Sequence, residues 1–336
     1  MDGLLIKPLD FPWVTYDPFL FCAFHHDKYP KGTPNLGPDP ILLEGRRLGE
    51  DFNNQFGWNM YHGETVPGFP AHPHRGFETV TIAAKGLVDH SDSMGASGRF
   101  GNGDVQWMTA GSGVQHSEMF PLLNQKEPNE LMLFQIWLNL PAASKMTKPH
   151  FAMLWHEAIP VVEVKSANGS SFIKLIAGKF EDYHAPAPAP NSWATDPENE
   201  VAIWLIDMEP GAELSLPVIH KDITRTLYYY EGNGISVNDG VVAGKQSIRM
   251  DADIQVNIKN GSFRSSFLYL QGKPISEPVA QYGPFVMNTQ EEITHAFREY
   301  QQSQFGGWPW PKYDQVHPAD KGRFAIHANG RTEIPG

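Results

Sequence analysis

Two short motifs in the first half of the chain carry side chains that bind metal ions in proteins. His72 and His74 are separated by one residue, and His116 and Glu118 repeat that spacing further along the chain. Because alternate residues of a β-strand project to the same side, each pair can direct both side chains toward one point. Two adjacent strands would then place three imidazoles and one carboxylate in a common cavity. We therefore predict that these four residues form one metal site.

The donor set limits which metal ions fit. Neutral imidazole and carboxylate ligands suit Fe, Mn, Ni, Cu or Zn, and no thiolate lies near the four residues, which argues against a structural zinc site. Four protein ligands leave two positions of an octahedral ion open. A redox metal with adjacent open positions can hold a chelating organic molecule and dioxygen together. Ligand type alone does not separate iron from its neighbours.

The segments that must position these residues have the pattern of short strands. Runs rich in β-branched and aromatic residues recur at a spacing of roughly 8–12 residues, which is typical of a sandwich or small barrel. These runs are FETVTIAA, GLVDHSD, DVQWMTA, GVQHSEMF and ELMLFQIWLNL, and a second series follows residue 200. Gly111 and Gly113 are expected to form the tight turn that precedes His116. Residues 180–200, rich in Ala and Pro, are expected to form an extended surface loop.

One helix is indicated near the C-terminus, at about residues 288–305. Asn288 or Thr289 can cap it, with a glutamate three residues later, and Gly306 can end it. Its apolar face would comprise Ile293, Ala296, Phe297 and Tyr300. The prolines of the following WPWPKYDQVHP predict a non-helical tail on the surface.

Composition favours two β domains and narrows the classes of partner. A chain of 336 residues can form two cores, and its 31 glycines and 28 prolines favour short strands joined by turns. The net charge of −12 offers no basic stripe, so we expect neither direct nucleic-acid binding nor membrane binding. One cysteine, no signal-peptide pattern and no long apolar run predict a cytoplasmic protein.

Several of these motifs resemble the signature of the pirin family, whose members are bicupins. The resemblance is carried by HPHRGFETVT, GLVDHSDSMG and GDVQWMTAGSGVQHSEMF, with further matches at DPFL, FQIWLNLP and GPFVMNTQEEI. It covers nearly the whole chain. It implies an all-β fold of two stacked cupin domains, each a jelly-roll β-barrel, with a C-terminal helix. We expect a metal-binding cupin domain over residues 1–146 and a degenerate cupin domain, with the helix and tail, over residues 147–336.

The resemblance also implies an iron site. The family's metal ligands fall on His72, His74, His116 and Glu118, so Fe²⁺ is the expected cofactor, with Mn, Ni, Cu or Zn as substitutes. Glu78 stands where many other cupins have a carboxylate ligand. Because that position is not usually a ligand in pirins, we expect Glu78 to orient an imidazole by accepting its N–H, with direct binding of the metal as the alternative.

Other polar residues near the motifs allow two interpretations each. His90 and Asp92 either line the cavity mouth or make turn hydrogen bonds. Gln135 and Trp137 are more often core and wall residues than catalytic ones. The segment between residues 25 and 60 is longer than in compact pirins and should lie near the metal cavity. Its region contains three histidines that we interpret as surface or loop residues: His25, His26 and His62.

The second half of the chain lacks the paired motifs. His220 has no His-x-His partner and no later His-x-Glu pair, so we expect that this domain has lost metal binding, as in the family. The other histidines there are scattered and are interpreted as structural or surface residues.

The resemblance implies two kinds of function. The first is a quercetin 2,3-dioxygenase-type oxygenase that acts on a flavonol or similar chelating small molecule, with Glu118 as the catalytic acceptor of the substrate's hydroxyl proton. The second is a redox-sensing regulatory protein that binds a transcriptional or metabolic protein partner through an iron-dependent surface. A cupin with another small substrate, such as a diketone, is a third alternative, because one scaffold hosts many chemistries. We expect a monomer with its substrate in the N-terminal cavity.

Overall fold

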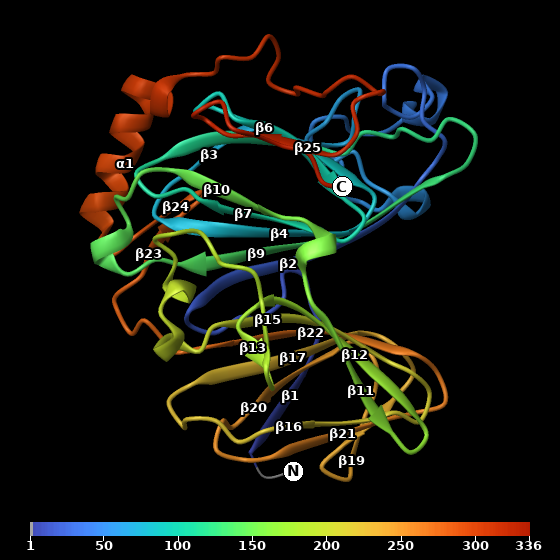
Figure 1. Cartoon of the computed structure of the whole chain (residues 1–336). Coiled ribbons are helices and arrows are strands. Elements are labelled where there is room, and N and C mark those ends of the chain that lie inside the picture. The colour runs from blue at the N-terminus through green and yellow to red at the C-terminus, as the bar shows by residue number, and fades with distance from the viewer. Residues whose placement is uncertain (1–2) are drawn as a thin grey trace. The chain divides into compact units, whose positions relative to one another are not determined.

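The computed structural model describes residues 3–336 and is built mostly of β-strands (Figure 1). Its contacts divide it into two compact units. The larger unit comprises residues 24–136, 140–156 and 277–336, and the smaller unit comprises the described residues up to 23, residues 137–139 and residues 157–276. The mostly β chain with a C-terminal helix agrees with the predicted fold class. The predicted domain boundary after residue 146 stays a prediction.

The larger unit contains two main sheets. One has the order β26-β25-β6-β5-β8-β3, and the other has the order β10-β7-β4-β9-β2, including the ends of β2 and β9 that belong to the smaller unit. The strands of these sheets are β2 (Phe19–Tyr29), β3 (Gly68–His74), β4 (Phe77–Lys85), β5 (Leu87–Asp92), β6 (Ser97–Gly101), β7 (Asp104–Thr109), β8 (Val114–Met119), β9 (Asn129–Asn139), β10 (His150–Leu154), β25 (Phe324–Ile326) and β26 (Thr332–Glu333).

The core of the larger unit is formed by apolar side chains from both sheets. Phe100 and Val88 of the first sheet and Met108 and Leu133 of the second belong to one buried cluster. Burial of each such side chain stabilises the fold by roughly 1.5–3 kcal/mol. The strand β4 is buried over most of its length, which explains its near-continuous run of β-branched and apolar residues. The two sheets thus enclose an interior into which β3, β4, β8 and β9 can direct polar side chains.

The smaller unit also has two main sheets, with the orders β1-β20-β17-β22-β15-β12-β11 and β16-β21-β18-β19. A two-stranded ladder of β13 and β14 lies within the predicted surface loop. The strands are β1 (Leu4–Pro8), β11 (Val161–Ser166), β12 (Gly169–Ala177), β13 (Lys179–Phe180), β14 (Tyr183–His184), β15 (Ala202–Met208), β16 (Glu213–Leu216), β17 (Thr224–Glu231), β18 (Ile235–Val237), β19 (Gly240–Val242), β20 (Gln246–Met250), β21 (Val256–Asn260) and β22 (Ser265–Gly272).

The helix α1 (Gln290–Ser303) belongs to the larger unit and lies beside β23 (Ala280–Tyr282) and β24 (Phe285–Met287) (Figure 1). Thr289 is its cap, and the side chains and backbones of Thr289 and Glu292 form a reciprocal capping box, as the sequence predicted. Ile293 and Ala296 are buried on its inner face. Seven short 3₁₀ turns complete the described elements: η1 (Pro40–Leu43), η2 (Gln55–Gly57), η3 (Ala142–Ser144), η4 (His156–Ala158), η5 (Trp193–Thr195), η6 (Pro197–Asn199) and η7 (Gln304–Gly306). None of the helices in the described range, residues 3–336, has the length and apolarity that crossing a bilayer requires.

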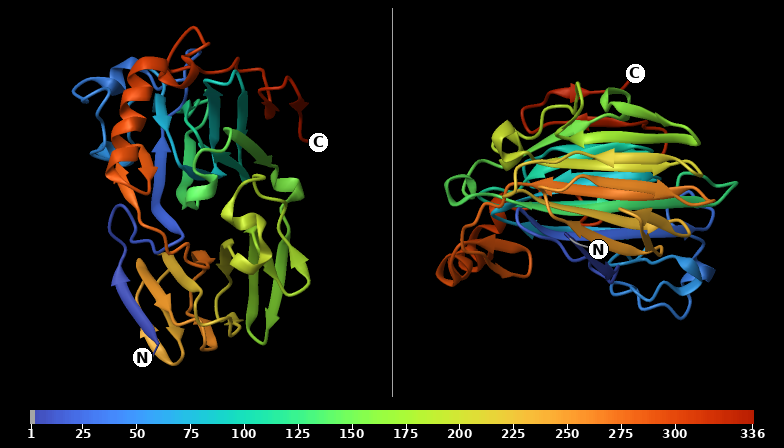
Figure 2. Two further views of the ribbon diagram at one scale, coloured as in Figure 1. Left: turned by 90° about the vertical axis from the view of Figure 1, so that its left-hand side faces the viewer. Right: turned by 90° about the horizontal axis from the view of Figure 1, so that it is seen from below.

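The tail after α1 is mostly exposed, as predicted, but it returns to the sheet of β3, β8 and β5 (Figure 2). The indole N–H of Trp310 donates to the carbonyl of Asp92 at 2.8 Å, and the carbonyl of Tyr313 accepts from the backbone N–H of Ala71 at 2.9 Å. The chain then adds β25 to the edge strand β6. The tail therefore connects the ends of β5 and β3 on its way to the sheet edge.

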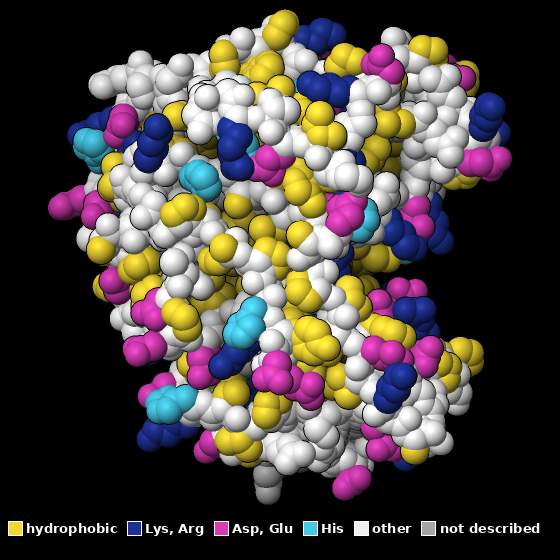
Figure 3. All heavy atoms as spheres, in the orientation of Figure 1, with side chains coloured by type: hydrophobic (Ala, Val, Ile, Leu, Met, Phe, Trp, Pro, Cys, Tyr) yellow, Lys and Arg dark blue, Asp and Glu magenta, His cyan; other side chains and the backbone are white. Residues whose placement is uncertain are grey.

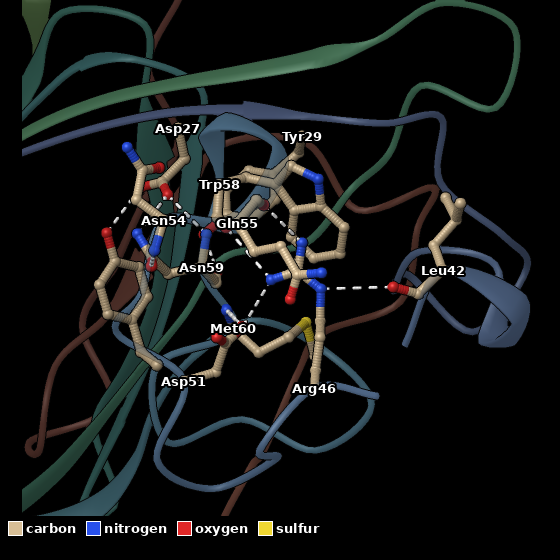
Figure 4. Close-up of polar contacts among 11 residues, drawn as sticks. Asp27, Tyr29, Leu42, Arg46, Asp51, Asn54, Gln55, Trp58, Asn59 and Met60 are labelled. Atoms are coloured by element: carbon tan, nitrogen blue, oxygen red, sulfur yellow. Dashed lines mark hydrogen bonds and ion pairs between the residues drawn. The ribbon is translucent and has the colours of Figure 1, made fainter. Parts of the chain in front are cut away.

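A buried arginine organises the long segment between β2 and β3 (Figure 4). Arg46 forms a 2.6 Å ion pair with Asp51 and lies 3.5 Å from the centre of the Trp58 ring. It also donates hydrogen bonds to the carbonyls of Leu42, Gln55 and Trp58. Because these partners lie between residues 42 and 58, one side chain joins distant parts of the segment.

The same segment approaches β3 through Tyr61. The Tyr61 ring stacks on Phe69 of β3 at 5.0 Å, and the Phe69 ring lies 6.3 Å from that of His72. The hydroxyl of Tyr61 donates to the buried carboxylate of Asp27 at 2.7 Å and lies 2.8 Å from Nδ1 of His25. The interpretation of His25 as a surface or loop residue is therefore wrong, because it lies on β2 and this hydrogen bond allows its ring to be buried.

Candidate metal centre

The two predicted motifs lie on adjacent strands of one sheet. β3 and β8 pair antiparallel, and His72 lies directly opposite His116. A β-bulge precedes His72, and such bulges redirect the side chains that follow them. His74 follows two residues later on the same strand, so the strand period carries it to the same side as His72. The structure thus brings the three histidines together.

The three imidazoles converge closely enough to hold one ion. Their ring centres are separated by 4.5 Å between His72 and His116, 4.8 Å between His72 and His74, and 5.0 Å between His74 and His116. One nitrogen of each ring can be chosen so that all three lie within 4.8 Å of one another. Ligand nitrogens at about 2.1 Å from a shared metal lie at most about 4.2 Å apart, so a small movement of the rings closes the site.

Hydrogen bonds and burial prepare these rings for a metal. Nδ1 of His72 lies 2.9 Å from the carbonyl of Pro70 and donates to it, which leaves Nε2 as the ligand atom. The carbonyl of Pro284 makes a hydrogen bond with His74. His116 is fully buried, and neither of its ring nitrogens makes a hydrogen bond within residues 3–336. Since buried polar atoms nearly always have a partner, the residues fit a metal ion that supplies one.

The electrostatic environment favours the neutral imidazoles that metals require. Burial lowers the pKa of His72 to about 4 and lowers the pKa values of His74 and His116 well below the usual value for histidine. The neighbouring histidines lower these pKa values further. At neutral pH the three rings are therefore unprotonated, so no proton has to leave before a metal binds.

Glu118 is buried near the histidines but is held by other side chains. Its Oε2 atom lies 3.9 Å from Nε2 of His116, and its carboxylate is not in the group of atoms that converge within 4.8 Å. Oε2 accepts a hydrogen bond from Nε2 of Gln135 at 2.9 Å, and Oε1 accepts one from the hydroxyl of Thr81 at 2.9 Å. Burial raises the pKa of Glu118, whereas these hydrogen bonds lower it. Its assignment as the fourth ligand stays a prediction.

The other polar residues that the sequence suggested near the site, His90, Asp92 and Glu78, lie on two different strands. His90 and Asp92 lie on β5, on the other side of β8, and the His90 ring is 5.6 Å from that of His116. They also pair with each other at 3.2 Å, and Asp92 accepts two backbone hydrogen bonds in the turn that follows. Asp92 therefore makes turn hydrogen bonds, as one interpretation expected, whereas the position of this pair at a cavity mouth stays a prediction. Glu78 lies on β4 in the other sheet, where it accepts a 2.6 Å hydrogen bond from Thr109.

Two residues that hold the carboxylate of Glu118, Gln135 and Thr81, were not predicted as site residues from the sequence. Gln135, interpreted as a core or wall residue, binds Glu118, whereas Trp137 packs against Phe21 at 5.0 Å. A polar residue inside the apolar run ELMLFQIWLNL was the available signal for Gln135. Thr81 offered no comparable signal, because threonine is a common strand residue.

The residues next to the ligand positions connect this site to the C-terminal helix. Arg75, which follows His74, is buried and forms a 2.9 Å ion pair with Glu299 of α1. Gln115, which precedes His116, donates to the carbonyl of Gln304 at 2.7 Å and accepts from the hydroxyl of Tyr300 at 3.0 Å. The strand period explains this arrangement, because residues adjacent to ligands must face away from them.

The predicted turn before His116 is present and needs its glycines. Gly111 and Gly113 both have positive φ, at 50° and 129°. A Cβ atom at Gly111 would lie 2.1 Å from the carbonyl oxygen of Thr147, and one at Gly113 would lie 2.7 Å from the ring of Phe305. Both positions therefore combine an unusual backbone conformation with a close approach that excludes a side chain.

A cavity of about 400 Å³ opens elsewhere in the larger unit and contains none of the three histidines. Its wall includes Phe120, and an ion pair at 3.0 Å joins two other lining residues, Lys85 and Glu130. Of the predicted ligands only His72 is partly exposed, while His74, His116 and Glu118 are buried.

The smaller unit has a different set of histidines. His220 is exposed, and its Nδ1 atom lies 3.5 Å from Oδ2 of Asp222. No group of three potential metal ligands converges among the described residues that belong to this unit alone.

Comparisons with known proteins agree with this geometry. The family model described as Pirin matches residues 48–138, and the model described as Pirin C-terminal cupin domain matches residues 203–306. The protein Pirin-1 of Arabidopsis thaliana is 38% identical over 244 residues, which cover 71% of this chain and 78% of that protein.

Solved structures show the same fold. A quercetin 2,3-dioxygenase from Acinetobacter baumannii superposes with a TM-score of 0.69 at 30% identity, covering 86% of each chain. A bacterial pirin from Escherichia coli in complex with nickel(II) has a TM-score of 0.50 at 14% identity, covering 82% of this chain and 93% of that one, and supports the fold alone. The predicted pair of cupin domains with a C-terminal helix is thereby confirmed. From its two family matches and its similarity to Pirin-1, we conclude that the chain belongs to the pirin family.

Proposed function

We propose that this pirin is an Fe²⁺-dependent oxygenase of the quercetin 2,3-dioxygenase type, acting on a flavonol or a similar chelating small molecule. The observation that carries the proposal is the convergence of three neutral histidines on one point, two of them buried and His72 partly exposed. Neither ring nitrogen of His116 makes a hydrogen bond among the described residues. The solved quercetin 2,3-dioxygenase that covers 86% of this chain supports the reaction type.

Glu118 completes the proposed donor set. Its 3.9 Å separation from Nε2 of His116 is within the roughly 4.2 Å that two ligands of one ion can span. Three imidazoles and one carboxylate suit Fe²⁺, and Ni²⁺, Mn²⁺, Cu²⁺ or Zn²⁺ could substitute.

The side chains would divide the work of the reaction between them. When bound, the metal would supply Lewis-acidic and redox chemistry to a chelating substrate. His72, His74 and His116 hold it in place, and Pro70 orients the His72 ring through the Nδ1 hydrogen bond. Glu118 accepts the proton of the substrate's hydroxyl group at one of its carboxylate oxygens. The burial of His74 and His116 keeps water from that side of the reacting atoms.

The test combines metal analysis with oxygen uptake. The purified protein should bind one divalent metal and, when loaded with Fe²⁺, consume dioxygen with quercetin. The variant His74→Ala should lose both properties, whereas His220→Ala, which removes an exposed histidine, should keep both. Full turnover by His74→Ala would contradict the proposal, as would metal-loaded wild-type protein that leaves flavonols unchanged.

A regulatory role is the second candidate, and one observation favours it. Arg75 and Gln115, each adjacent to a histidine of the site, both bind α1 or the segment after it. A change in the metal's oxidation state would therefore act on residues that contact an outer element. The mixed acidic and basic side chains on the face drawn in Figure 3 suit a protein partner better than a nucleic acid. Hydrogen exchange of α1 that is identical in the ferrous and ferric proteins would remove this candidate.

A further inference from the structure

The carboxylate of Glu118 is the end point of a closed set of three polar contacts. The hydroxyl oxygen of Thr81 lies 2.9 Å from Oε1 of Glu118 and 2.6 Å from Oε1 of Gln135. Nε2 of Gln135 in turn donates to Oε2 of Glu118 at 2.9 Å. Each carboxylate oxygen thus has its own partner, and the two partners also contact each other.

These partners come from the opposite sheet. Glu118 lies on β8, whereas Thr81 lies on β4 and Gln135 on β9, and β4 and β9 are neighbours in the second sheet. Thr81 is fully buried and Glu118 is 4% exposed, so water competes little for these hydrogen bonds. The contacts therefore cross the interior of the barrel and link the strand that bears His116 to the facing sheet.

We propose that Thr81 and Gln135 are positioning residues that hold the carboxylate of Glu118 and thereby determine how it meets the metal. The proposal deepens the proposed function and rests on it for the role of Glu118. Two hydrogen-bond partners restrict both the rotation of the carboxylate and its distance from His116. Without them, the carboxylate loses its orientation, although all of the predicted ligands are still present.

Thr81→Val tests the proposal with almost no change in shape, since it replaces the hydroxyl group by a methyl group. We expect metal affinity or kcat to fall by roughly 10–100-fold, as outer-sphere changes at metal sites do, with a smaller change in KM. The visible absorption spectrum of the Co²⁺-loaded protein should also shift, because it reports the ligand arrangement directly. Thr81→Ser keeps the hydroxyl group and should restore both the spectrum and kcat.

The chain offers a matched control on the same strand. Thr79 lies two residues before Thr81 on β4, is fully buried, and its hydroxyl oxygen has no hydrogen-bond partner in the described part of the chain. Thr79→Val is therefore the same substitution at the same depth, without the contact to Glu118. It should leave the Co²⁺ spectrum and kcat unchanged.

Gln135→Leu provides an independent test of the same proposal. Gln135→Asn is a milder substitution to use if the Gln135→Leu variant does not fold. Because Thr81 and Gln135 act on one carboxylate, the double variant should lose less than the product of the two single effects. Co²⁺ spectra identical to wild type in both Thr81→Val and Gln135→Leu would overturn the proposal. A wild-type protein that binds no Co²⁺ would overturn it equally.

The spectra separate this proposal from the proposed function. A wild-type protein that never oxidises a flavonol, but whose Co²⁺ spectrum responds to Thr81→Val, would refute the reaction and support the positioning role. A protein that turns over flavonols, with a spectrum and kcat insensitive to both substitutions, would support the reaction and refute the positioning role.

Discussion

The larger and smaller units are both built from two main β-sheets, yet their interiors differ in chemistry. In the larger unit, β8 is buried at every residue and carries Gln115, His116, Ser117 and Glu118. In the smaller unit, β22 is also buried at every residue, but its central residues are the apolar run Phe267–Leu270.

The interior of the smaller unit is packed with aromatic side chains. Phe267 stacks on Tyr229 at 4.8 Å, and Tyr269 stacks on Trp204 at 4.6 Å, all within one apolar cluster. Stacked rings of this kind add stability beyond the area they bury. The comparison teaches that the cupin scaffold does not by itself determine function, because its inward positions can carry either metal-binding residues or apolar core residues.

Removal of one histidine of the predicted metal site should have the largest effect on metal binding, the property that distinguishes the larger unit. We expect His116→Ala to lower metal affinity by more than the roughly 10–100-fold that outer-sphere changes cost, because it removes a direct ligand. Equilibrium dialysis with Ni²⁺ or Co²⁺ measures this loss. His220→Ala in the smaller unit is the control and should bind metal as the wild type does. Equal affinities in the two variants would show that the ion binds elsewhere.

The buried charges of the larger unit should matter for its stability. Arg99 and Asp89 are fully buried and form an ion pair at 2.6 Å, and Arg99 also donates to three carbonyls of the tail. Asp89→Ala leaves the guanidinium buried without its counter-charge, so we expect a loss of about 3–5 kcal/mol in unfolding free energy. Urea denaturation measures it.

An exposed ion pair in the smaller unit provides the control for the unfolding free energy of Asp89→Ala. Lys259 and Glu213 lie 3.1 Å apart at the surface, and Lys259→Ala should cost no more than about 1 kcal/mol. A cost for Asp89→Ala as small as this would mean that water reaches the Arg99 pair.

A core substitution in the smaller unit should separate stability from metal binding. Leu227 is fully buried in the apolar cluster, and Leu227→Ala should cost about 2–5 kcal/mol through lost burial and the cavity that remains. Metal affinity per folded molecule should stay at the wild-type value. A parallel loss of affinity, measured where the variant is fully folded, would mean that the two interiors are coupled.

We also expect a pH dependence of stability that arises from the histidines of the larger unit. Burial lowers the pKa of His72 from its ordinary value near 6.5 to about 4, so the unfolded chain binds protons more readily than the folded one between these values. The metal-free protein should therefore have its full stability above about pH 6.5 and lose part of it as the pH falls toward 4. Denaturation at several pH values measures this slope, which His72→Gln should make shallower. A slope unaffected by the substitution would assign the effect to other groups.

Local patterns in the sequence were sufficient to predict some features of the fold and of the site. The one-residue spacing within each motif determines that His72 faces the same way as His74, and the capping residues determine where α1 begins, because both depend on neighbours a few residues apart. The glycines before His116 likewise mark a turn through their own backbone freedom.

Other features depend on contacts between distant segments, and only the tertiary structure decided them. Three features each join segments far apart in the chain. They are the register that sets His72 opposite His116, the hydrogen bonds of Thr81 and Gln135 to Glu118, and the hydrogen bond that buries His25. A strand's period tells which side a residue faces but not what lies across the interior, because that depends on how two sheets pack. The sequence by itself therefore determined the candidate ligands and the β character of this pirin, and the packing of its sheets decided which side chains support them.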